Sequence, residues 1–396
     1  MTALTTAAGT VPSHPLLDAA RLRLEDHLRH VGPIPWAVPL VRELEAAGLT
    51  GRGGGGFPVA RKLTVAASAA AATGRVPLVV ANGAEGEPAS AKDRRLLAHA
   101  PHLVLDGLQL AAAAIGADRA HVLVAPAVLA AVQAALVERA GVDRVPVEVT
   151  VAAERFVAGE ESAVVAALEG RPALPGDKLR RVVESGVHGR PTAVQNVETL
   201  AHLALIARFG AGWFRSRGTA TEPGTALVTV SGALDRPGVV EVAHGTPLRA
   251  VLDGAGLRHP APVLVGGFHG AWLAPHEVGV ATFSRASLGG FGAATGAGVL
   301  IALPPGVSGM VETARIAAYL AGQSARQCGP CQGGLPRMAD VLGRIAAGDR
   351  DPRLVAELHR LAGLTAGRGA CHHPDGTVRL VRSALRVFGT DLGAIS

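Results

Sequence analysis

Aromatic residues, cysteines and lysines are scarce in this sequence. Aromatic residues make up 3% of the 396 residues, and three cysteines and three lysines stand beside 35 arginines. Although the net charge is +6, the arginines are scattered, and no basic run alternates with stacking residues in the manner of nucleic-acid-binding proteins. We therefore expect no nucleic-acid partner, and the basic balance reflects a general preference for arginine.

Long apolar runs and a leader segment are also missing. No uninterrupted apolar stretch reaches the roughly 18–20 residues that a transmembrane helix needs. The N-terminal residues 1–14 have neither the basic nor the apolar region of a secretory signal. Since thiols stay reduced in the cytoplasm, the low cysteine content favours a cytoplasmic protein, including one at the periphery of a membrane complex.

The apolar pattern changes character along the chain. Residues 16–30 have apolar positions three and four apart, which predicts one amphipathic helix. Short apolar strands such as 76–81 then alternate with helical stretches, which predicts a mostly parallel α/β sheet covered on both faces. Further on, two alternating strands flank the turn at 235–238, and the glycine-rich stretch 289–298 reads as a flexible connector. We expect an N-terminal helical segment at 1–47, an α/β domain at 48–218, a small β-plus-helix module at 219–300 and a helical domain at 301–396.

A glycine run at Gly51–Gly56 suggests a binding loop. It matches G-x-G-x-x-G, but it follows a helical pattern instead of a strand, and no acidic residue follows before Glu85. A dinucleotide-binding Rossmann site is therefore not expected here. Because ordering so many glycines is costly, we expect a backbone-lined cradle for an anionic or planar cofactor, with Arg52 and Lys62 supplying positive charge.

Polar residues follow the apolar strand at 76–81. Asn82, Glu85 and Glu87 lie at the carboxyl end of that strand, where α/β sheets bind ligands. Their amide and carboxylate groups suit hydroxyls and ring nitrogens. Two further polar clusters repeat this character, at 158–162 and 192–199.

The three cysteines all fall in the helical part. Cys328 and Cys331 have C-x-x-C spacing, and Cys371 lies 40 residues downstream. From the residues alone, a redox pair, a metal site and isolated thiols all remain open. A redox C-x-x-C typically occurs in a thioredoxin-like context of strands and helices, which this stretch lacks, so metal binding is favoured.

Five motifs stand in order between about residues 48 and 375: GRGGGGFPVARK, NGAEGEP, FVAGEES, VQNVET and SARQCGPC. They resemble the patterns G-R-G-G-x-G-F-P…K, N-A-D-E-G-E-P, Y-x-x-G-E-E-T, V-N-N-V-E-T and S-C-x-x-C-x-x-C. These patterns belong to the NADH-oxidising flavoprotein subunit of respiratory complex I and to related subunits of NAD-linked hydrogenases and formate dehydrogenases. The resemblance implies an FMN-binding α/β domain, a small β-grasp ligand-binding domain and a C-terminal helical bundle with a [4Fe–4S] cluster.

The resemblance also implies a function and a set of site residues. Hydride would pass from NAD(P)H to FMN, and single electrons would pass through the cluster to a protein acceptor, with no catalytic side chain needed. The implied flavin-binding residues are Gly51, Arg52, Gly53, Gly54, Lys62, Asn82, Glu85, Phe156, Gly159, Glu160, Gln195 and Asn196. Glu87 and Glu161 would face the nicotinamide nucleotide, with Lys178 near its phosphates and Phe57 against its adenine.

Several motif positions depart from the family patterns. Ala84, Phe156 and Gln195 replace an aspartate, a tyrosine and an asparagine, so each changes one polar contact. Of the aromatic residues expected around the adenine only Phe57 remains, and stacking contributes about 1–3 kcal/mol per base. Arg180 and Arg181 are in place to stack on the base or to bind a 2′-phosphate, which leaves NADPH open beside NADH.

The cysteine motif departs most. The first family cysteine corresponds to Ala325, whereas Cys328, Cys331 and Cys371 match the other three. Three alternatives follow: a [4Fe–4S] cluster with a non-cysteine fourth ligand, a [3Fe–4S] cluster, or zinc bound by three cysteines and a histidine. The candidates for the fourth ligand are Ser324, His372, His373 or a small external molecule.

The leading functional prediction is an oxidoreductase of the NADH dehydrogenase type that works in electron transport. Its acceptor would be a ferredoxin or a [2Fe–2S] subunit. The alternative is an electron-relay or scaffold subunit that binds FMN but is not reduced by NAD(P)H. A third option is a ligand-binding protein that uses the β-plus-helix module after redox chemistry has been lost.

Overall fold

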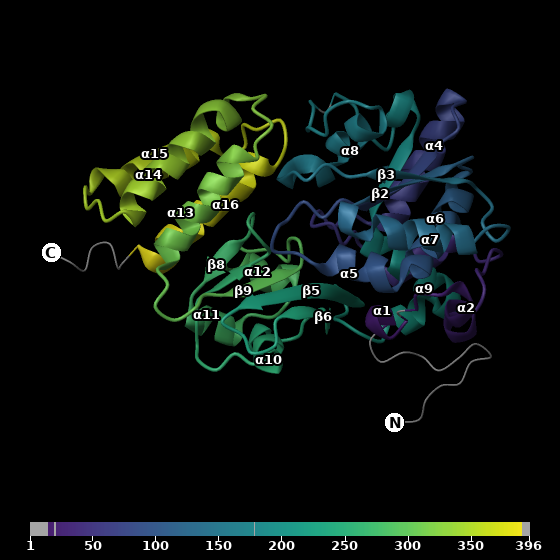
Figure 1. Ribbon diagram of the computed structural model, residues 1–396, viewed down its shortest axis with the longest axis horizontal. Coiled ribbons are helices and arrows are strands. Elements are labelled where there is room, and N and C mark those ends of the chain that lie inside the picture. Colours follow the sequence, from purple (N-terminus) through teal and green to yellow (C-terminus); the bar gives the residue numbers. More distant parts are fainter. Residues whose placement is uncertain (1–14, 20, 178, 390–396) are drawn as a thin grey trace.

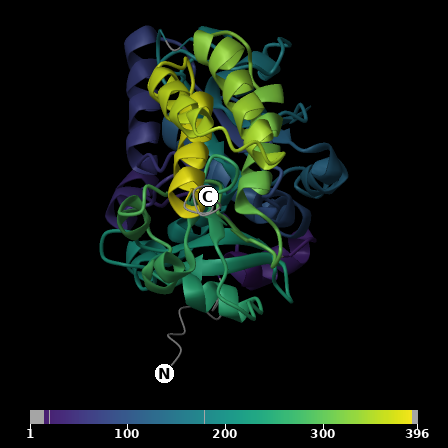
Figure 2. The ribbon, with the colours of Figure 1, turned by 90° about the vertical axis from the view of Figure 1, so that its left-hand side faces the viewer.

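The computed structural model describes residues 15–19, 21–177 and 179–389. An α/β domain, a second mixed sheet with short helices, and a C-terminal helical bundle lie against one another (Figure 1). A view turned by 90° again places the bundle above the second sheet (Figure 2). The bundle contacts both other parts, since Gln323 Oε1 accepts the Phe156 N–H at 3.1 Å and Thr313 Oγ1 accepts the Trp272 indole N–H at 2.9 Å.

The α/β domain has a parallel sheet of four strands in the order β3-β2-β1-β4. Alternate residues of β1 enter different cores, since Val79 and Ala81 pack in the larger core and Leu78 and Val80 in a smaller one on the opposite face. Both faces of the sheet are thus covered, and the predicted α/β class is confirmed. Residues 192–196, interpreted from the sequence only as a polar cluster, form the edge strand β4. The strands are β1 (Leu78–Gly83), β2 (Ala120–Val124), β3 (Val147–Val151) and β4 (Thr192–Asn196).

Helices cover this sheet on both faces. The helix α6 is almost wholly buried, and Gly107 lets it approach α9 so closely that an added Cβ would lie 2.0 Å from the Leu200 carbonyl oxygen. Among the described helices, α6 included, none is both long and apolar enough to span a membrane. The helices of this domain are α4 (Val59–Thr73), α5 (Lys92–His99), α6 (Pro101–Ile115), α7 (Leu129–Glu138), α8 (Glu161–Leu168) and α9 (Val197–Arg215).

The second sheet has five strands in the order β6-β5-β9-β7-β8. The predicted hairpin is present as β5 (Thr225–Gly232) and β6 (Gly238–Ala243), which pair antiparallel. The stretch 289–298 is not a connector between domains as expected, because it leads into β9, which pairs with both β5 and β7. The remaining elements are α10 (Leu248–Gly254), β7 (Val263–Val265), β8 (Ala271–Leu273), α11 (Pro275–Val280), α12 (Arg285–Gly289) and β9 (Val299–Ala302).

The bundle is fastened to the second sheet through the buried Trp272 of β8. The Trp272 indole N–H donates to Thr313 Oγ1 at 2.9 Å, and its backbone N–H donates to Ser383 Oγ at 2.9 Å. These partners lie on the first and the last helix of the bundle. The helices are α13 (Gly309–Gly322), α14 (Leu335–Ala346), α15 (Arg353–Thr365) and α16 (His373–Phe388), and a π-helical turn at Pro330–Gly334 precedes α14.

The single helix predicted for residues 16–30 is wrong, because the chain forms α1 (Pro15–Asp18) and α2 (Leu24–Val31) instead. Two distant carboxylates account for the break. Glu241 accepts the N–H groups of Leu16 and Leu17 at 2.9 and 3.1 Å, and Glu138 accepts the N–H of Leu24 at 2.7 Å. Each carboxylate satisfies free N–H groups at a helix start, so tertiary contacts favour two helix starts over one continuous helix. A third helix, α3 (Leu40–Ala47), follows.

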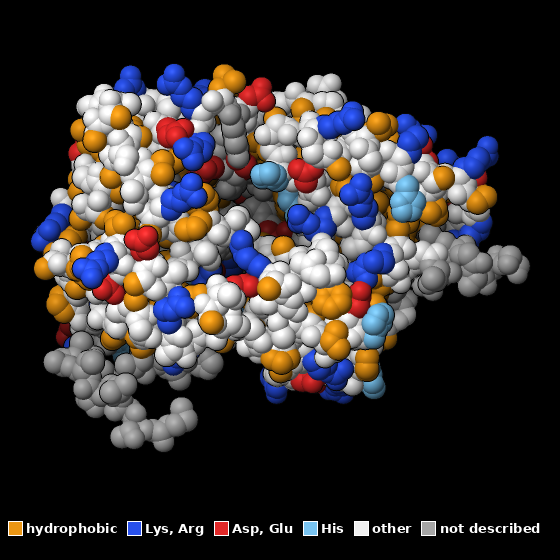
Figure 3. Space-filling model, turned by 180° about the vertical axis from the view of Figure 1, so that it is seen from behind, with side chains coloured by type: hydrophobic (Ala, Val, Ile, Leu, Met, Phe, Trp, Pro, Cys, Tyr) orange, Lys and Arg blue, Asp and Glu red, His pale blue; other side chains and the backbone are white. Residues whose placement is uncertain are grey.

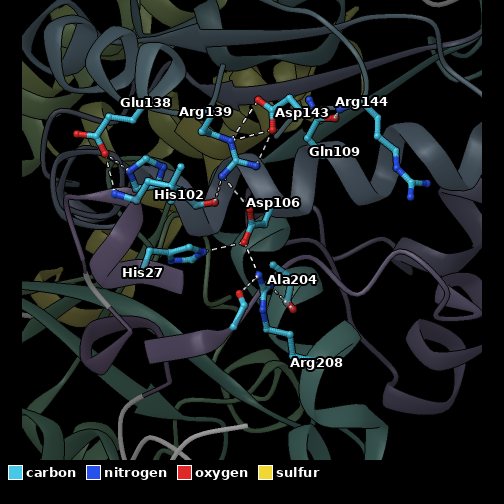
Figure 4. A network of polar contacts seen from close by, with 12 residues as sticks. His27, His102, Asp106, Gln109, Glu138, Arg139, Asp143, Arg144, Ala204 and Arg208 are labelled. Carbon is cyan, nitrogen blue, oxygen red and sulfur yellow. Dashed lines mark hydrogen bonds and ion pairs between the residues drawn. The ribbon is translucent and has the colours of Figure 1, made fainter. Parts of the chain in front are cut away.

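A buried network around Asp106 joins α2, α7 and α9 to α6 (Figure 4). Asp106 contacts His27 Nε2 at 2.8 Å and Arg139 Nη1 at 2.8 Å, and it also pairs with Arg208. Burial alone would raise the pKa of Asp106, but these partners hold that pKa well below its usual range. A buried charge that is compensated in this way fixes the relative positions of the helices.

Candidate functional site

The glycine loop and the ends of two strands of the first sheet meet at one edge. The loop is closed by the Gly51 N–H, which donates to the Phe57 carbonyl at 2.9 Å. A Cβ on Gly53 would lie 3.4 Å from the Asn196 side chain, so the loop passes over the end of β4. Asn196 is paired in register with Asn82 of β1. The face of the molecule seen from behind is hollowed near its centre, with charged side chains of both signs around the hollow (Figure 3).

The other side of the glycine loop contacts the second sheet. Gly54 has a φ of +96°, and a Cβ there would lie 3.4 Å from the Gly296 carbonyl oxygen. Gly56 has a φ of +58° and lies directly against the guanidinium of Arg285. Residues with side chains would be strained at both positions, which explains why this loop needs glycine. A cavity of about 140 Å³ separates the loop from the second sheet.

Arg52 lies in this cavity wall, under the loop. Its Nη1 donates to Thr50 Oγ1 at 3.0 Å and its Nη2 to the Pro223 carbonyl at 3.4 Å. Its Nε has no hydrogen-bond partner among the described residues. Burial lowers the pKa of Arg52 to about 10, which leaves it charged at neutral pH. The positive charge therefore lies behind the glycine loop, where the N–H groups of the loop can also contact an anion.

Asn82 and Glu85 have different surroundings at the end of β1. Asn82 Nδ2 donates to the Gly159 carbonyl at 2.9 Å, which brings the loop before α8 to the end of β1. Glu85 has a side chain that is only 2% exposed and accepts the N–H groups of Asp93 and Arg94 at 2.9 and 3.0 Å. Its carboxylate thus caps the start of α5. Burial and the neighbouring Asp93 raise the pKa of Glu85.

Glu160 is likewise engaged as a helix cap. It accepts the N–H groups of Ser162 and Ala163 at the start of α8, at 2.9 and 3.4 Å. Glu161 instead pairs with Lys62, whose Nζ also donates to the Val194 carbonyl at 3.0 Å. Lys62 therefore joins α4, α8 and β4 around the same edge.

A buried lysine beneath this edge has no role in the sequence-based prediction. Lys92 Nζ contacts Asp93 at 2.7 Å, Glu198 at 2.8 Å and Asn196 Oδ1 at 3.2 Å. Burial acts to lower the pKa of Lys92, but the two carboxylates raise it above its ordinary value. This ion cluster orients Asn196, whose Nδ2 donates to Asp93 at 2.8 Å. The rarity of lysine was the only sequence signal that could have pointed to it.

Glu87 lies where the α/β domain meets the second sheet. Its carboxylate accepts the N–H of Phe268 at 2.8 Å and the N–H of Ala89 at 3.1 Å. Burial raises the pKa of Glu87 to about 7, because the two hydrogen bonds offset only part of the desolvation. Glu87 is therefore close to half protonated at neutral pH.

The remaining predicted residues lie around the same edge, with two qualifications. Phe57 is 40% exposed, and Gln195 is buried with an Nε2 that has no partner in the described part of the chain. Phe156 turns toward the bundle, with its ring centroid 5.6 Å from that of His373 and 6.2 Å from that of Tyr319. Lys178 lies outside the described residues. A buried amide near the end of β4 that has no partner among the described residues, and a glycine loop that passes over the end of the same strand, fit a planar, polar cofactor such as a flavin.

The three cysteines converge between the π-helical turn and the start of α16. Burial raises the pKa of Cys331 to about 12, and the nearby Cys328 and Cys371 sulfurs add to the shift. Burial also acts to raise the pKa of Cys328, but N–H groups of Ala370 and Cys331 that donate to its sulfur lower it overall. Sulfurs this close, with backbone donors aimed at them, fit thiolate ligands of an iron–sulfur cluster.

Candidates for a fourth ligand differ sharply in their surroundings. Both ring nitrogens of His373 are engaged, by His269 Nε2 at 3.0 Å and by the Leu320 carbonyl at 2.9 Å. The His372 side chain is 93% exposed. Ser324 is buried, and its Oγ has no hydrogen-bond partner among the residues described.

The described residues give no support to the zinc alternative. No group of three or more His, Cys, Asp or Glu side chains in residues 15–19, 21–177 and 179–389 is arranged to hold a single metal ion. Zinc draws its ligands to within about 2.3 Å, whereas a cluster holds its cysteines apart around a larger body.

Comparisons with known proteins give separate matches for the α/β domain, the second sheet and the bundle. Three family profiles match: the Nuo51 FMN-binding domain at 44–205, the SLBB domain at 227–262, and the NADH-ubiquinone oxidoreductase-F iron-sulfur binding region at 312–394. The F subunit of NADH-quinone oxidoreductase of Salmonella typhimurium is 30% identical over 90% of this chain and 84% of its own length. The NADH-quinone oxidoreductase F subunit numbered 2 of Rhizobium meliloti is 30% identical over 90% of this chain and 88% of its own length.

Solved structures of an NAD⁺-reducing [NiFe]-hydrogenase are also similar. The H₂-reduced state has a TM-score of 0.82 and 31% identity, and the air-oxidised state has a TM-score of 0.82 and 30% identity. Each match covers 91% of this chain. This chain spans only 62% and 64% of the two hydrogenase chains.

Proposed function

Because the chain belongs to the family of NADH-quinone oxidoreductase F subunits, we propose that it passes electrons from NADH through FMN and an iron–sulfur cluster to a separate redox protein. The family resemblance, the fold class and the FMN and cluster cofactors predicted from the sequence are confirmed. One observation carries the proposal: a single loop, which follows β7, links the domain of the glycine loop to the bundle where the cysteines converge. In this loop Phe268 donates to Glu87 of the α/β domain, and His269 contacts His373 of the bundle.

We propose that FMN lies between the glycine loop and the strand ends. When bound, FMN supplies hydride acceptance and single-electron release. The N–H groups of the glycine loop and Arg52 would bind its phosphate, and Gln195 Nε2, which has no partner among the described residues, would donate a hydrogen bond to it. Asn82 and Asn196 are oriented toward it by the Gly159 carbonyl and by Asp93. Glu85 and Glu160 contribute through their backbone, because their carboxylates cap helices.

NADH would bind on the side of Glu87 and Glu161. Glu161 is held by Lys62, and Glu87 by the Phe268 N–H, so both carboxylates are oriented before the nucleotide arrives. With a pKa of about 7, Glu87 can donate or accept a hydrogen bond at neutral pH. Phe57 offers an exposed ring for the adenine. The assignment of Lys178 to the phosphates stays a prediction.

We propose that Ser324 supplies the fourth cluster ligand, in place of the family cysteine at position 325. Its Oγ is the buried side-chain oxygen of this segment that has no partner among the described residues, whereas His373 is fully engaged. Oxygen is a harder ligand than thiolate, so it holds iron less tightly. The iron at this corner is therefore the one that exchanges most readily.

The acceptor, the domain boundaries and the location belong to the same proposal. The relatives are subunits of larger oxidoreductases, so the partner is another redox protein, for which we propose a ferredoxin or a [2Fe–2S] subunit. We retain 1–47, 48–218, 219–300 and 301–396 as domains and the cytoplasm as location. The relay alternative, without reduction by NADH, is not favoured, since the relatives are NADH-quinone oxidoreductase subunits.

An anaerobic titration tests the function. The purified protein should contain FMN, iron and sulfide, and NADH should bleach the flavin band and reduce the cluster. Titration with NADPH in parallel compares the two nucleotides, and Glu161→Gln is a matched variant expected to weaken nucleotide binding without loss of FMN. A flavin that stays oxidised with both nucleotides would favour the relay alternative.

A further inference from the structure

Two histidines outside the cysteine motif tie together the segments that carry the cysteines. His373 lies two residues after Cys371, and its Nε2 is 2.9 Å from the Leu320 carbonyl near the end of α13. The chain leaves α13 toward Cys328 and Cys331. This hydrogen bond therefore joins the Cys371 segment to the segment that contains the other two cysteines.

His269, from the loop between β7 and β8, contacts the His373 ring from the opposite side. Its Nε2 lies 3.0 Å from His373 Nδ1. A carbonyl oxygen only accepts, so His373 donates to Leu320 through Nε2, and its neutral ring accepts the His269 proton at Nδ1. His269 thus selects the tautomer that binds Leu320. Partners of this kind orient the groups around metal sites although they do not touch the metal.

The His269 ring and backbone are packed closely against α16 and Phe156. A Cβ on Gly376 of α16 would lie 2.2 Å from His269 Cγ, so the helix has no side chain where the ring lies. The Phe156 ring closes the other side, with centroids 4.5 Å apart, and Arg379 donates to the His269 carbonyl at 3.0 Å.

The same loop also reaches the nucleotide side of the proposed flavin site. Phe268, the neighbour of His269, donates its backbone N–H to Glu87 at 2.8 Å. Phe156 lies just before the α8 loop that contacts Asn82 through Gly159. The loop Gly266–Gly270 therefore touches both redox sites at once.

We propose that His269 is a positioning residue for the iron–sulfur cluster. Through His373 it holds the Cys371 segment against the Cys328–Cys331 segment, and it thereby sets the midpoint potential of the cluster and the rate at which electrons reach it from the flavin. The proposal rests on the proposed function, because it requires FMN and the cluster in one chain.

Variants of His269 in the complete holoprotein test this. His269→Leu retains bulk but cannot donate a hydrogen bond, whereas His269→Gln places an amide donor at a similar distance. His269→Leu should shift the midpoint potential and the EPR signal of the cluster, and should slow flavin-to-cluster transfer about tenfold to a hundredfold. Reduction of the flavin by NADH, followed by stopped flow, should be unchanged. His269→Gln should restore the wild-type values.

Arg386→Gln is the matched control. Arg386 also ties α16 to the second sheet, through Glu277 and the Trp272 carbonyl at 2.9 Å, but it lies at the end of α16 far from Cys371. It should leave the cluster signal and potential unchanged. The proposal would be overturned if His269→Leu had the wild-type midpoint potential, EPR signal and transfer rate. It would also be overturned if Arg386→Gln changed these quantities as much as His269→Leu does. If NADH reduces no flavin in the wild type, the proposed function fails, and the dithionite-reduced EPR signal of His269→Leu still decides the role of His269.

Discussion

Ala325 stands beside Ser324, where the family pattern has a cysteine, and we propose that this corner of the cluster is held by the Ser324 hydroxyl instead of a thiolate. Ala325→Cys should supply a fourth thiolate and retain all four irons on mild oxidation, because thiolate binds iron more tightly than a hydroxyl oxygen. The wild type should lose one iron under the same conditions. EPR spectroscopy and iron analysis before and after ferricyanide treatment measure the difference.

Ala321→Cys provides the control for this prediction. Ala321 is buried near the end of α13, four residues before the half-buried Ala325, and it lies outside the motif. Its thiol should leave iron loss at the wild-type level. Equal iron loss in Ala325→Cys and the wild type would contradict the assignment of this corner.

Glu87 makes the stability of the protein depend on pH in a specific direction. Its pKa is raised from 4.5 to about 7, so between these values the folded protein holds a proton that the unfolded chain has released. The contribution of Glu87 to the free energy of unfolding therefore falls as pH rises through this window and levels off above it. Glu87→Gln should remove about 2–3 kcal/mol of this decline between pH 5 and pH 8.

Urea titrations of the cofactor-free protein at the two pH values measure this effect. The carboxyl groups of Glu85 and Glu241 also have raised pKa values, but they are present in both proteins and cancel in the comparison. A parallel decline in the wild type and the variant would show that Glu87 is not buried in solution.

The contact between α6 and α9 depends on a glycine. Gly107→Ala would place a methyl group 2.0 Å from the Leu200 carbonyl oxygen, so the two helices must separate. We expect a loss of roughly 1–3 kcal/mol of stability, measured by urea denaturation. Gly343 of α14 is the matched control, because an added Cβ there meets no described atom within 4 Å. Gly343→Ala should be stabilising by about 0.5–1 kcal/mol, and a similar loss in both variants would argue against close packing at Gly107.

Periodicity predicted the elements whose partners are close in sequence. The β5–β6 hairpin and the alternation of strands and helices after residue 76 follow from local patterns. The break between α1 and α2 does not, because it depends on Glu138 and Glu241, which are distant in sequence. Strand β4 was missed because it is short and ends in Gln195 and Asn196, whose polar side chains serve the site.

In the site, too, the sequence predicted what local motifs encode and missed what distant contacts create. The five motifs led to the glycine loop, the strand-end loops and the cysteines, because spacing and residue type carry their chemistry. Lys92 and His269 stand in no motif, and their roles arise only from partners brought together by the fold. The carboxylates of Glu85 and Glu160 cap helices, which no motif indicated, and the assignment of both residues to the flavin stays a prediction.

The whole molecule is basic, and Lys and Arg side chains are spread over the face with the hollow (Figure 3). A positive surface accelerates encounters with acidic proteins, and added salt screens this attraction. Electron transfer to an acidic ferredoxin should therefore slow by about tenfold between low and high salt. A neutral quinone serves as the control acceptor, with a rate that should not change, and stopped-flow kinetics with both measure it. If salt slowed electron transfer to the quinone as much as to the ferredoxin, the effect would arise from electron transfer within this protein and not from its encounter with the acceptor.

The pairing of β1 with β4 has a consequence for the synthesis of the protein. Asn82 and Asn196, which pair in register, are 114 residues apart in the chain. At about 5–20 residues per second, the ribosome needs roughly 6–23 s to make the intervening segment. Until then β1 has an open edge on which other chains could align, and the β4 side of the proposed flavin site does not exist. The cofactor can therefore bind only late in synthesis. Before that point the nascent chain is most in need of a chaperone.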